Sequence, residues 1–274
     1  MWNNIVQTAD YLEQLTRIRP TTGIVLGTGL GNLADEINRS ETIPYQHIPN
    51  FPSATVEGHE GNLIFGELCG VPVVAMQGRF HYYEGHSMQE LTFPLRVLKQ
   101  LGINQLFISN AAGGINPGFQ VGDLMLIRDH INFFPDNPLR GPNLEPMGTR
   151  FPDMSEVYDR SLRDLAQSVA KEAGLKLQSG IYVGNPGPSF ETPAEYTHYR
   201  TIGGDAIGMS TIPEVIVARH MSLPVLAVSV ITNVAVIGHF TENKHEDVQK
   251  AAGQAGRDLA TLFKGVLRLS PYSA

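Results

Sequence analysis

Apolar segments with the length of β-strands alternate along this chain with amphipathic segments of helical period. Residues 22–26 favour a buried strand, and residues 61–68 and 71–76 favour a hairpin of two strands. Residues 2–17 and 155–174 instead repeat their apolar positions with the period of a helix. This alternation predicts an α/β fold, in which ligands bind where strands end. Because the unusual polar residues follow successive predicted strands, we expect them to line one crevice.

A segment dense in polar side chains, residues 78–86 (Gly-Arg-Phe-His-Tyr-Tyr-Glu-Gly-His), follows one of these strands. Arg79 can bind an oxyanion through its planar guanidinium, and His81 can supply a second donor. Ser87 and Glu90 have the spacing of a capping box and predict a helix that begins there. The alternative is a solvated loop with an incidental aromatic pair.

A glycine-rich turn, residues 27–31, follows the first predicted strand and precedes a helix expected to run to about Asn38. Consecutive glycines at this point can turn backbone N–H groups toward an anion. The dinucleotide-binding fingerprint requires a third glycine where Asn32 stands, and no lysine with serine or threonine completes a Walker loop. The turn is therefore a candidate phosphate loop, and a plain tight turn is the alternative.

Small residues follow the predicted strand 105–109. Residues 110–117 (Asn-Ala-Ala-Gly-Gly-Ile-Asn-Pro) predict a loop in which a ligand can approach the main chain closely. The alternative is a turn that simply requires positive φ angles.

A second polar segment, residues 184–192, precedes a clear helix start. Thr192 and Glu195 form a capping box with proline at the first helical position. Capping accounts for Glu195 and leaves Glu191 without a structural role. Phe190 and Glu191 therefore favour a stacking surface beside a carboxylate acceptor, with a solvated loop glutamate as the alternative.

The predicted strand 206–209 leads directly into Ser210. Thr211 and Glu214 repeat the capping-box spacing and predict another helix. The segment is not a nucleophile elbow, because Ile212 stands where the closing glycine is required. Ser210 is better interpreted as a hydroxyl donor at the end of a strand.

The last predicted strand, residues 223–231, ends next to Asn233, whose side chain offers both a donor and an acceptor. A long final helix is expected from residue 243 or 244 to residue 269. His245 lies in its first turn.

Composition limits the classes of function. The 274 residues carry a net charge of -7, so nucleic-acid binding is not expected. The single Cys69 excludes an internal disulfide framework and a multi-cysteine metal site. Neither a signal peptide nor an apolar run of membrane-spanning length is recognisable, and we expect a cytoplasmic protein. With no repeat or domain boundary evident, residues 1–274 are predicted to form one domain.

The longest irregular segment is the proline-rich loop 132–153. Such loops in compact domains are usually functional or flexible. Apolar side chains including Phe133 and Phe151 punctuate it, so we expect it to pack against another part of the protein or a neighbouring subunit.

Together, the candidate residues suit two ligand chemistries. A tetrahedral oxyanion suits the glycine amides, Arg79, His81 and Ser210. A flat heterocycle with amide-like edges suits Phe190, Glu191 and Asn233. The space between them could be filled by Tyr83, Met209 and His245. This combination predicts a nucleoside that binds together with inorganic phosphate.

Over nearly its whole length, the sequence resembles the trimeric class of purine nucleoside phosphorylases. The blocks that carry the resemblance are Gly-Arg-Phe-His-Tyr-Tyr-Glu-Gly-His (78–86), Asn-Ala-Ala-Gly-Gly (110–114), Gly-Pro-Ser-Phe-Glu-Thr (187–192), Gly-Met-Ser-Thr (208–211) and Thr-Asn (232–233). The fold that the resemblance implies is α/β, a single-domain mixed β-sheet with a small distorted barrel surrounded by helices, assembled as a homotrimer.

The resemblance also implies roles for individual residues. Phosphate would be bound by Thr28, Arg79, His81, the Ala111 amide and Ser210, with His59 near the phosphate and the ribose 5′ side. Ribose would be contacted by Tyr83, Met209 and His245. The purine would be read by Glu191 and Asn233 in a pocket lined by Ala111, Ala112 and Phe190. The catalytic residues would be Asn233, Glu191 and His81, and Phe151 would reach into a neighbouring subunit's site.

The implied reaction is phosphorolysis of purine nucleosides through a ribosyl oxocarbenium ion, stabilised by the charge of the phosphate. Asn233 would hydrogen-bond N7 as negative charge builds on the departing purine. Glu191 would accept from N1–H and favour 6-oxopurines, since adenine lacks that proton. No metal or organic cofactor is expected, and inorganic phosphate is a co-substrate.

Some positions depart from the family's pattern. Thr28 stands where many members have serine, which keeps the hydroxyl. Asn185 and Pro186 stand where small apolar residues are common, and Val234 stands where animal members carry lysine. These departures, with a divergent loop at 236–240, leave the favoured base open, including whether xanthine is accepted.

Three other functions stay open on the sequence. A methylthioadenosine phosphorylase should carry acidic base recognition in place of Asn233, and the block around Tyr83 also argues against it. A nucleoside hydrolase would need an N-terminal aspartate cluster for calcium, which Asp10 and Asp35 do not form. A non-catalytic nucleoside sensor is opposed by the intact phosphate-binding residues.

Overall fold

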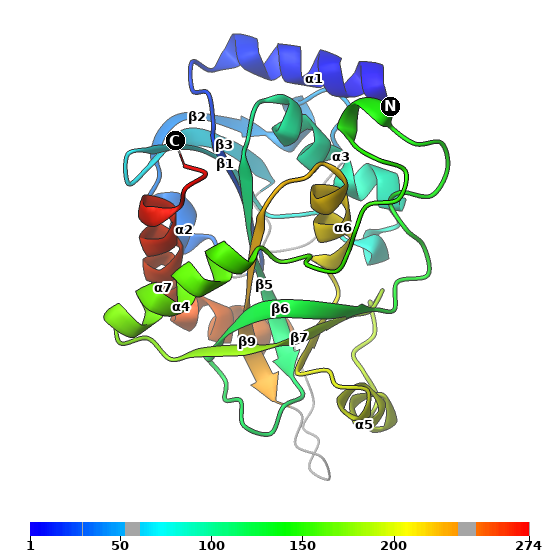
Figure 1. Ribbon diagram of the computed structural model, residues 1–274, viewed down its shortest axis with the longest axis vertical. Coiled ribbons are helices and arrows are strands. Elements are labelled where there is room, and N and C mark those ends of the chain that lie inside the picture. The colour runs from blue at the N-terminus through cyan, green and yellow to red at the C-terminus, as the bar shows by residue number, and fades with distance from the viewer. Residues whose placement is uncertain (29, 53–60, 235–244, 274) are drawn as a thin grey trace.

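The computed structural model describes residues 1–28, 30–52, 61–234 and 245–273, without the side chains of residues 32, 245–248 and 254 (Figure 1). Within these ranges, nine strands form one mixed sheet. The strands are β1 (Thr22–Leu26), β2 (Asn38–Pro44), β3 (Asn62–Leu68), β4 (Val71–Gln77), β5 (Gln105–Gly114), β6 (Leu124–Asn132), β7 (Leu177–Gly184), β8 (Ala206–Gly208) and β9 (Val225–Val234). The α-helices are α1 (Trp2–Leu15), α2 (Asn32–Asp35), α3 (Met88–Gln100), α4 (Arg160–Glu172), α5 (Pro193–Thr201), α6 (Ile212–His220) and α7 (His245–Leu269). Short 3₁₀ helices are η1 (Tyr45–His47), η2 (Tyr82–Glu84) and η3 (Glu145–Met147).

Strand β9 closes part of the sheet into a barrel. It runs parallel to β5 and antiparallel to β6. From β6 the ring continues through β7 and β8 back to β5. The remaining strands extend the sheet outward from β5 in the order β1, β4, β3, β2. The predicted fold class, a mixed sheet with a small barrel surrounded by helices, is confirmed. That residues 1–274 make one domain stays a prediction.

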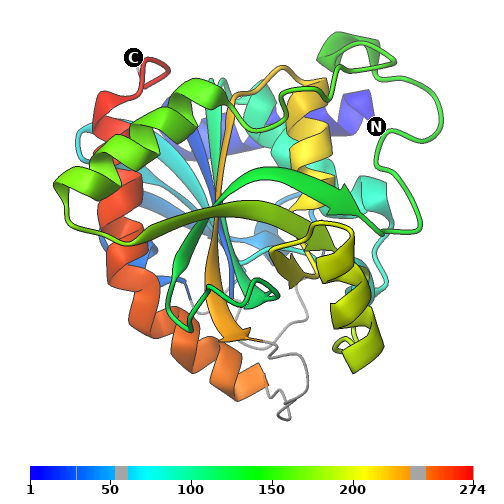
Figure 2. The ribbon, with the colours of Figure 1, turned by 60° about the horizontal axis from the view of Figure 1, so that its bottom comes forward.

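Helices cover both sides of the open part of the sheet (Figures 1 and 2). Helix α3 packs against α1 and α6 on one side, and α7 packs against α2 and α4 on the other. Each side has its own apolar core, with Leu12 and Val215 fully buried in one and Leu162 and Phe263 in the other. Full burial of such a side chain is worth about 1.5–3 kcal/mol.

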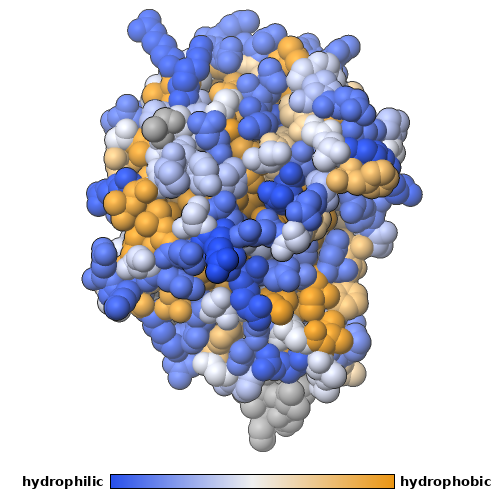
Figure 3. Space-filling view, viewed as in Figure 1, coloured by the Kyte–Doolittle hydropathy of each residue, from blue (hydrophilic) through white to orange (hydrophobic). Residues whose placement is uncertain are grey.

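The surface that faces the viewer in Figure 3 is mostly hydrophilic, with hydrophobic side chains gathered in separate patches. In the described ranges, no helix is both long enough and apolar enough to cross a membrane.

Several local predictions are confirmed. Ser87 caps α3, and Thr192 caps α5, each through a capping box with the glutamate three residues on. The β3–β4 hairpin turns at Cys69 and Gly70, which have φ angles of 56° and 80°. Positive φ at both turn positions matches the right-handed twist of the strands.

Two predicted helix boundaries are wrong. The helix expected up to Asn38 ends at Asp35, and Asn38 instead begins β2. Most side chains of β2 are exposed at the edge of the sheet, so it lacks the alternation that reveals a strand. The helix expected from residue 155 starts at Arg160, because Asp159 accepts a hydrogen bond from the Leu162 amide and caps it there.

One predicted loop continues as a strand, and one predicted strand runs further than expected. Residues 110–114 extend β5, and Asn233 lies within β9 rather than beyond it. These extensions pair with each other and with β8, so closure of the barrel keeps the small residues in the sheet. Of the segment 132–153, predicted to be irregular, Asn132 is the last residue of β6. The rest of the segment is irregular as predicted, with η3 as its one regular element among the described residues.

Candidate active site

One cavity of about 360 Å³ lies where β1, β4 and β7 end and where β5, β8 and β9 meet in the barrel. Its walls therefore come from six strands or the segments that follow them, and from helix α5. The lining residues are Thr28, Arg79, His81, Tyr83, Asn110, Ala111, Ala112, Gly113, Pro188, Phe190, Glu191, Tyr196, Ile207, Gly208, Met209, Ser210, Thr232 and Asn233.

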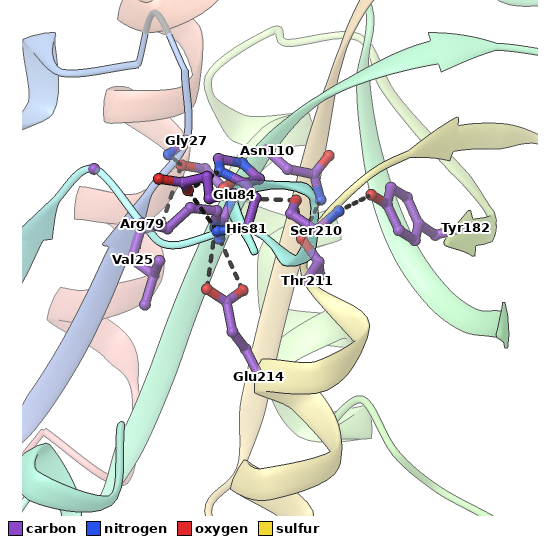
Figure 4. Close-up of polar contacts among 12 residues, drawn as sticks. Val25, Gly27, Arg79, His81, Glu84, Asn110, Tyr182, Ser210, Thr211 and Glu214 are labelled. Atoms are coloured by element: carbon purple, nitrogen blue, oxygen red, sulfur yellow. Dashed lines mark hydrogen bonds and ion pairs between the residues drawn. The ribbon is translucent and has the colours of Figure 1, made fainter. Parts of the chain in front are cut away.

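Arg79 forms one end of the cavity and is almost completely buried. Its Nε and Nη2 donate to the two carboxylate oxygens of Glu214 over 3.0 and 3.1 Å, and its Nη1 donates to the Ser109 carbonyl over 2.7 Å (Figure 4). A bidentate pair of this kind fixes the plane of the guanidinium. The Glu214 carboxylate also offsets the charge of Arg79, so this end of the cavity is rich in donors without a large excess of positive charge.

This pairing corrects the predicted role of Glu214. The expected capping box with Thr211 does not form, and Thr211 makes no side-chain cap hydrogen bond to α6. Its φ of 72° and ψ of -53° lie outside the helical regions, and its hydroxyl accepts from Asn110 Nδ2 over 2.9 Å. Glu214 is thereby left in the first turn of α6, directed at Arg79 (Figure 4).

Close approach of the chain at Gly27 keeps Arg79 next to the first strand. A Cβ atom on Gly27 would lie 2.8 Å from the Ser109 carbonyl oxygen and 3.3 Å from Arg79 Nη1. Only glycine fits there without a shift of the main chain. The Gly27 amide donates to Ser109 Oγ over 3.3 Å.

His81 lies beside Arg79, and Glu84 holds it in place. Glu84 Oε1 accepts from the His81 amide over 2.7 Å and lies 3.1 Å from His81 Nδ1. Because a carboxylate can only accept, this contact places a proton on Nδ1. Burial lowers the pKa of His81, although the hydrogen bond with Glu84 acts against the shift. The ring stacks on Tyr83 at a centroid distance of 4.6 Å.

Ser210 completes this end. Its hydroxyl lies 3.5 Å from Arg79 Nη1 and 3.1 Å from Thr211 Oγ1. Its amide donates to the Tyr182 hydroxyl over 3.4 Å. Burial raises the pKa of Tyr182 to about 12, so that hydroxyl stays neutral.

The cavity is also lined by one carboxamide and one carboxylate, those of Asn233 and Glu191. Asn233 lies on β9 in register with Gly113 of β5, where a Cβ atom would come within 3.3 Å of Asn233 Nδ2. Thr232 Oγ1 donates to Asn233 Oδ1 over 3.3 Å. Glu191 accepts from Asn185 Nδ2 over 2.8 Å, and Phe190 beside it is partly exposed.

Burial raises the pKa of Glu191, while hydrogen bonds from Tyr196 and Asn185 act in the opposite direction. The lining of one cavity therefore combines a donor-rich end around Arg79 with one carboxylate and one carboxamide. The donor-rich end suits an oxyanion, and the carboxylate and carboxamide suit the edge of a heterocycle that carries both donors and acceptors.

Most residues that the sequence singled out come together here. The ones that line the cavity are Thr28, Arg79, His81, Tyr83, Ala111, Ala112, Phe190, Glu191, Met209, Ser210 and Asn233. His59 lies outside the described residues. His245 begins α7, and its side chain is not described. Phe151 does not line this cavity and is 84% exposed.

The sequence did not single out Glu84, Tyr196 or Glu214 as members of the site. Glu84 was visible within the segment 78–86, three residues after His81. Tyr196 lies in the first turn of α5, shortly after the Thr192 cap. The capping pattern predicts where this helix begins but not which of its faces lines a cavity. Glu214 was not predicted to belong to the site, because its spacing from Thr211 indicates a capping box. In the described part of the chain, no group of three or more His, Cys, Asp or Glu side chains could hold a metal ion.

Known proteins are similar to this chain in sequence and in fold. The family model of the phosphorylase superfamily matches residues 21–268. Purine nucleoside phosphorylase 1 of Geobacillus stearothermophilus is 51% identical over 96% of this chain and 96% of its own length. Purine nucleoside phosphorylase of Bos taurus is 48% identical over 97% of this chain and 94% of its own length. The chain therefore belongs to the phosphorylase superfamily, in the family of purine nucleoside phosphorylases.

Solved structures agree with this assignment. Schistosoma mansoni purine nucleoside phosphorylase in complex with inosine superposes with a TM-score of 0.94 at 45% identity, over 98% of this chain and 97% of that one. A schistosoma purine nucleoside phosphorylase in complex with hypoxanthine also has a TM-score of 0.94 at 45% identity, over 98% of both chains.

Proposed function

We propose that this protein catalyses the reversible phosphorolysis of 6-oxopurine ribonucleosides and deoxyribonucleosides, such as inosine and guanosine, as part of purine salvage. A phosphate oxygen bonds to C1′ of the sugar while the bond from C1′ to N9 breaks. The bonding electron pair leaves with the purine, which takes up a proton, and the products are the free base and the sugar 1-phosphate. The supporting observation is a single cavity with donors for an oxyanion at one end and groups for a purine edge at the other.

At the donor-rich end, phosphate would be held by Thr28, Arg79, His81, the Ala111 amide and Ser210. Glu214 offsets the charge of Arg79, and burial lowers the pKa of His81. Phosphate binding would thus depend more on oriented hydrogen bonds than on net positive charge. The negative charge of phosphate remains available to stabilise the cationic sugar in the transition state.

At the other end, the purine would bind between Phe190 and the small residues of β5. Asn233 Nδ2 would donate to N7 as charge builds there, and the Glu191 carboxylate would accept from N1–H. Tyr83 and Met209, between the two ends, would contact the sugar. His59 and His245 would join the phosphate and ribose contacts.

The reaction needs no external electron donor or acceptor, and phosphate is the only co-substrate in the balanced equation. We therefore propose that no metal or organic cofactor takes part. Exhaustive dialysis against a chelator should leave turnover unchanged. A cytoplasmic location is also part of the proposal, and fractionation of the source cells tests it.

We further propose a homotrimer in which Phe151 approaches a neighbouring subunit's cavity. The support is the exposure of Phe151 on the proline-rich loop, beside a second hollow that includes Arg150, Met154 and Ile216. Aromatic side chains are enriched at the interfaces between protein subunits. The mass of the particle in solution, measured by light scattering, tests the assembly.

Substrate comparison tests the proposed base specificity. At saturating phosphate, inosine and guanosine should be cleaved with much higher kcat/KM than adenosine, with xanthosine as an open case. The sugar product should be the 1-phosphate, in equal amount to the base. Preference for adenosine or methylthioadenosine would contradict the proposed role of Glu191.

A further inference from the structure

The side chain of Asn185 lies directly behind the proposed purine-reading carboxylate. Asn185 follows β7 and is only 8% exposed. Its amide N–H donates to the carbonyl of Gly208, at the end of β8, over 3.0 Å. Gly208 itself lines the cavity. The main chain at Asn185 is therefore anchored to the cavity wall.

Both ends of the Asn185 carboxamide are used. Oδ1 accepts from the Gly187 amide over 2.8 Å, and Nδ2 donates to Glu191 Oε1 over 2.8 Å. The first contact fixes the plane of the carboxamide, because it closes a local turn two residues long. The second contact is a hydrogen bond to a carboxylate, which is stronger than one between neutral groups.

The glycine held by Asn185 is also part of the cavity's packing. Gly187 has a φ of 60°, and a Cβ atom there would lie 2.4 Å from Met209 Sδ and 3.2 Å from Tyr83 Cδ1. One carboxamide thus joins the segment that packs on Met209 and Tyr83 to the carboxylate of Glu191.

We propose that Asn185 is a positioning residue that holds the Glu191 carboxylate toward the purine and so sets the preference for 6-oxopurines over 6-aminopurines. This inference rests on the proposed function. Glu191 reads N1–H only if its carboxylate stays in one orientation and stays charged. A hydrogen bond from a buried carboxamide favours both conditions.

The surroundings of Glu191 disfavour its charged form, so the hydrogen bond that Asn185 donates to it is important. Burial raises the pKa of Glu191, and the nearby Glu195 raises it further. The hydrogen bonds from Tyr196 and Asn185 lower it. Tyr199 also faces this charge, which contributes to the raised pKa of that phenol. Glu195, Tyr196 and Tyr199, three titratable residues that interact with Glu191, all belong to α5.

Asn185→Leu keeps the approximate size of the side chain and removes the donor. Loss of one hydrogen bond to a charged group should lower kcat/KM for inosine about tenfold. Adenosine cleavage should fall less, so the ratio of the two kcat/KM values should drop. Because the charged form of Glu191 loses a donor, its pKa should rise, and the acid limb of the inosine kcat/KM profile should move to higher pH.

A role confined to loop stability would give a different result, because both substrates would then lose activity equally and the pH profile would keep its position. An equal loss of activity for both substrates would contradict the inference, and so would an unshifted pH profile. In the background of Glu191→Ala, Asn185→Leu should change kcat/KM for inosine by less than twofold. A full tenfold loss in that background would also contradict it.

The chain offers a matched control in Asn116. Its Oδ1 accepts from the Gly118 amide, and its Nδ2 donates to Asp205 Oδ1 over 2.8 Å, away from the cavity. Asn116→Leu removes the same pair of contacts and should leave the inosine-to-adenosine ratio unchanged. Wild-type protein that fails to cleave inosine would contradict the proposed function. Active wild-type protein with an unchanged ratio in Asn185→Leu would contradict only the positioning role.

Discussion

The buried pair of Arg79 and Glu214 sets the character of the donor-rich end of the cavity, where we propose that phosphate binds. Both side chains are at least 95% buried, and two hydrogen bonds join them. Removal of one partner from such a pair usually costs about 3–5 kcal/mol, because the other charge remains buried. A bound phosphate could supply the missing negative charge.

Glu214→Gln should therefore lower the midpoint of thermal unfolding. Saturating phosphate should raise the midpoint of this variant by more than it raises the midpoint of the wild type. Thermal unfolding with and without phosphate measures both effects. Asp123→Asn is a suitable control, since Asp123 pairs with Lys176 away from the cavity. Equal stabilisation of all three proteins by phosphate would contradict the expectation that phosphate replaces the lost charge beside Arg79.

Asn233 should act in the transition state rather than in folding. Its side chain is partly exposed in the cavity, and removal of one donor to a developing anion typically lowers kcat by about 10²–10³-fold. Asn233→Ala should thus reduce kcat for inosine by roughly this factor, with a change of only a few degrees in the unfolding midpoint. A variant with unchanged kcat would refute the role assigned to Asn233.

At the scale of elements, helix α5 connects the stability of a local element to the part of the cavity proposed to bind the purine. Thr192 Oγ1 accepts from the Glu195 amide over 3.3 Å, and Glu195 Oε2 accepts from the Thr192 amide over 2.7 Å. Loss of an N-cap side chain costs about 1 kcal/mol. Tyr196, in the same helix, lines the cavity.

Thr192→Ala should increase the rate of amide hydrogen exchange in α5 about fivefold, as expected for that loss of stability. Thr197→Ala, within the same helix, removes a hydroxyl that donates to the Pro193 carbonyl and serves as the control. Unchanged exchange in Thr192→Ala would mean that the cap does not limit the opening of α5.

Local signals in the sequence predicted the elements whose contacts are local. The capping boxes at Ser87 and Thr192 and the turn at Cys69 and Gly70 are complete within a few residues. The edge strand β2 was not predicted, because its mostly exposed residues show no alternation of apolar and polar side chains.

The same distinction holds within the candidate site. Polar residues after strands could be recognised in sequence and are brought together as expected. The partner of Arg79 could not, because Glu214 lies 135 positions away and its spacing from Thr211 imitates a cap. The tether from Asn185 to Glu191 likewise depends on how the segment after β7 folds back on itself.

At the scale of the whole molecule, barrel closure by β9 brings Asn233 opposite Gly113, on the wall of a cavity that also contains Arg79. The proposed trimer would add Phe151 from a neighbour. Phe151 does not line the cavity of its own chain. Its substitution therefore tests what a neighbouring subunit contributes and leaves the residues from the chain's own cavity unchanged.

Phe151→Ala should raise KM for inosine several-fold, because an aromatic contact to the sugar or base is lost. Its kcat should change less, since the groups proposed to act on the reacting atoms come from a single chain. Steady-state kinetics test this, with Val121→Ala as a control at another exposed apolar position. Unchanged KM would argue that Phe151 lies outside the assembled site.

The most direct test of the central claim is the release of hypoxanthine from inosine, measured with and without inorganic phosphate. If one cavity binds phosphate at the Arg79 end and the purine at the Glu191 end, release should require phosphate and should saturate with its concentration. Release at the same rate without phosphate would mean hydrolysis and would contradict the assignment of the donor-rich end. No release under either condition would instead favour a nucleoside-binding protein without this activity.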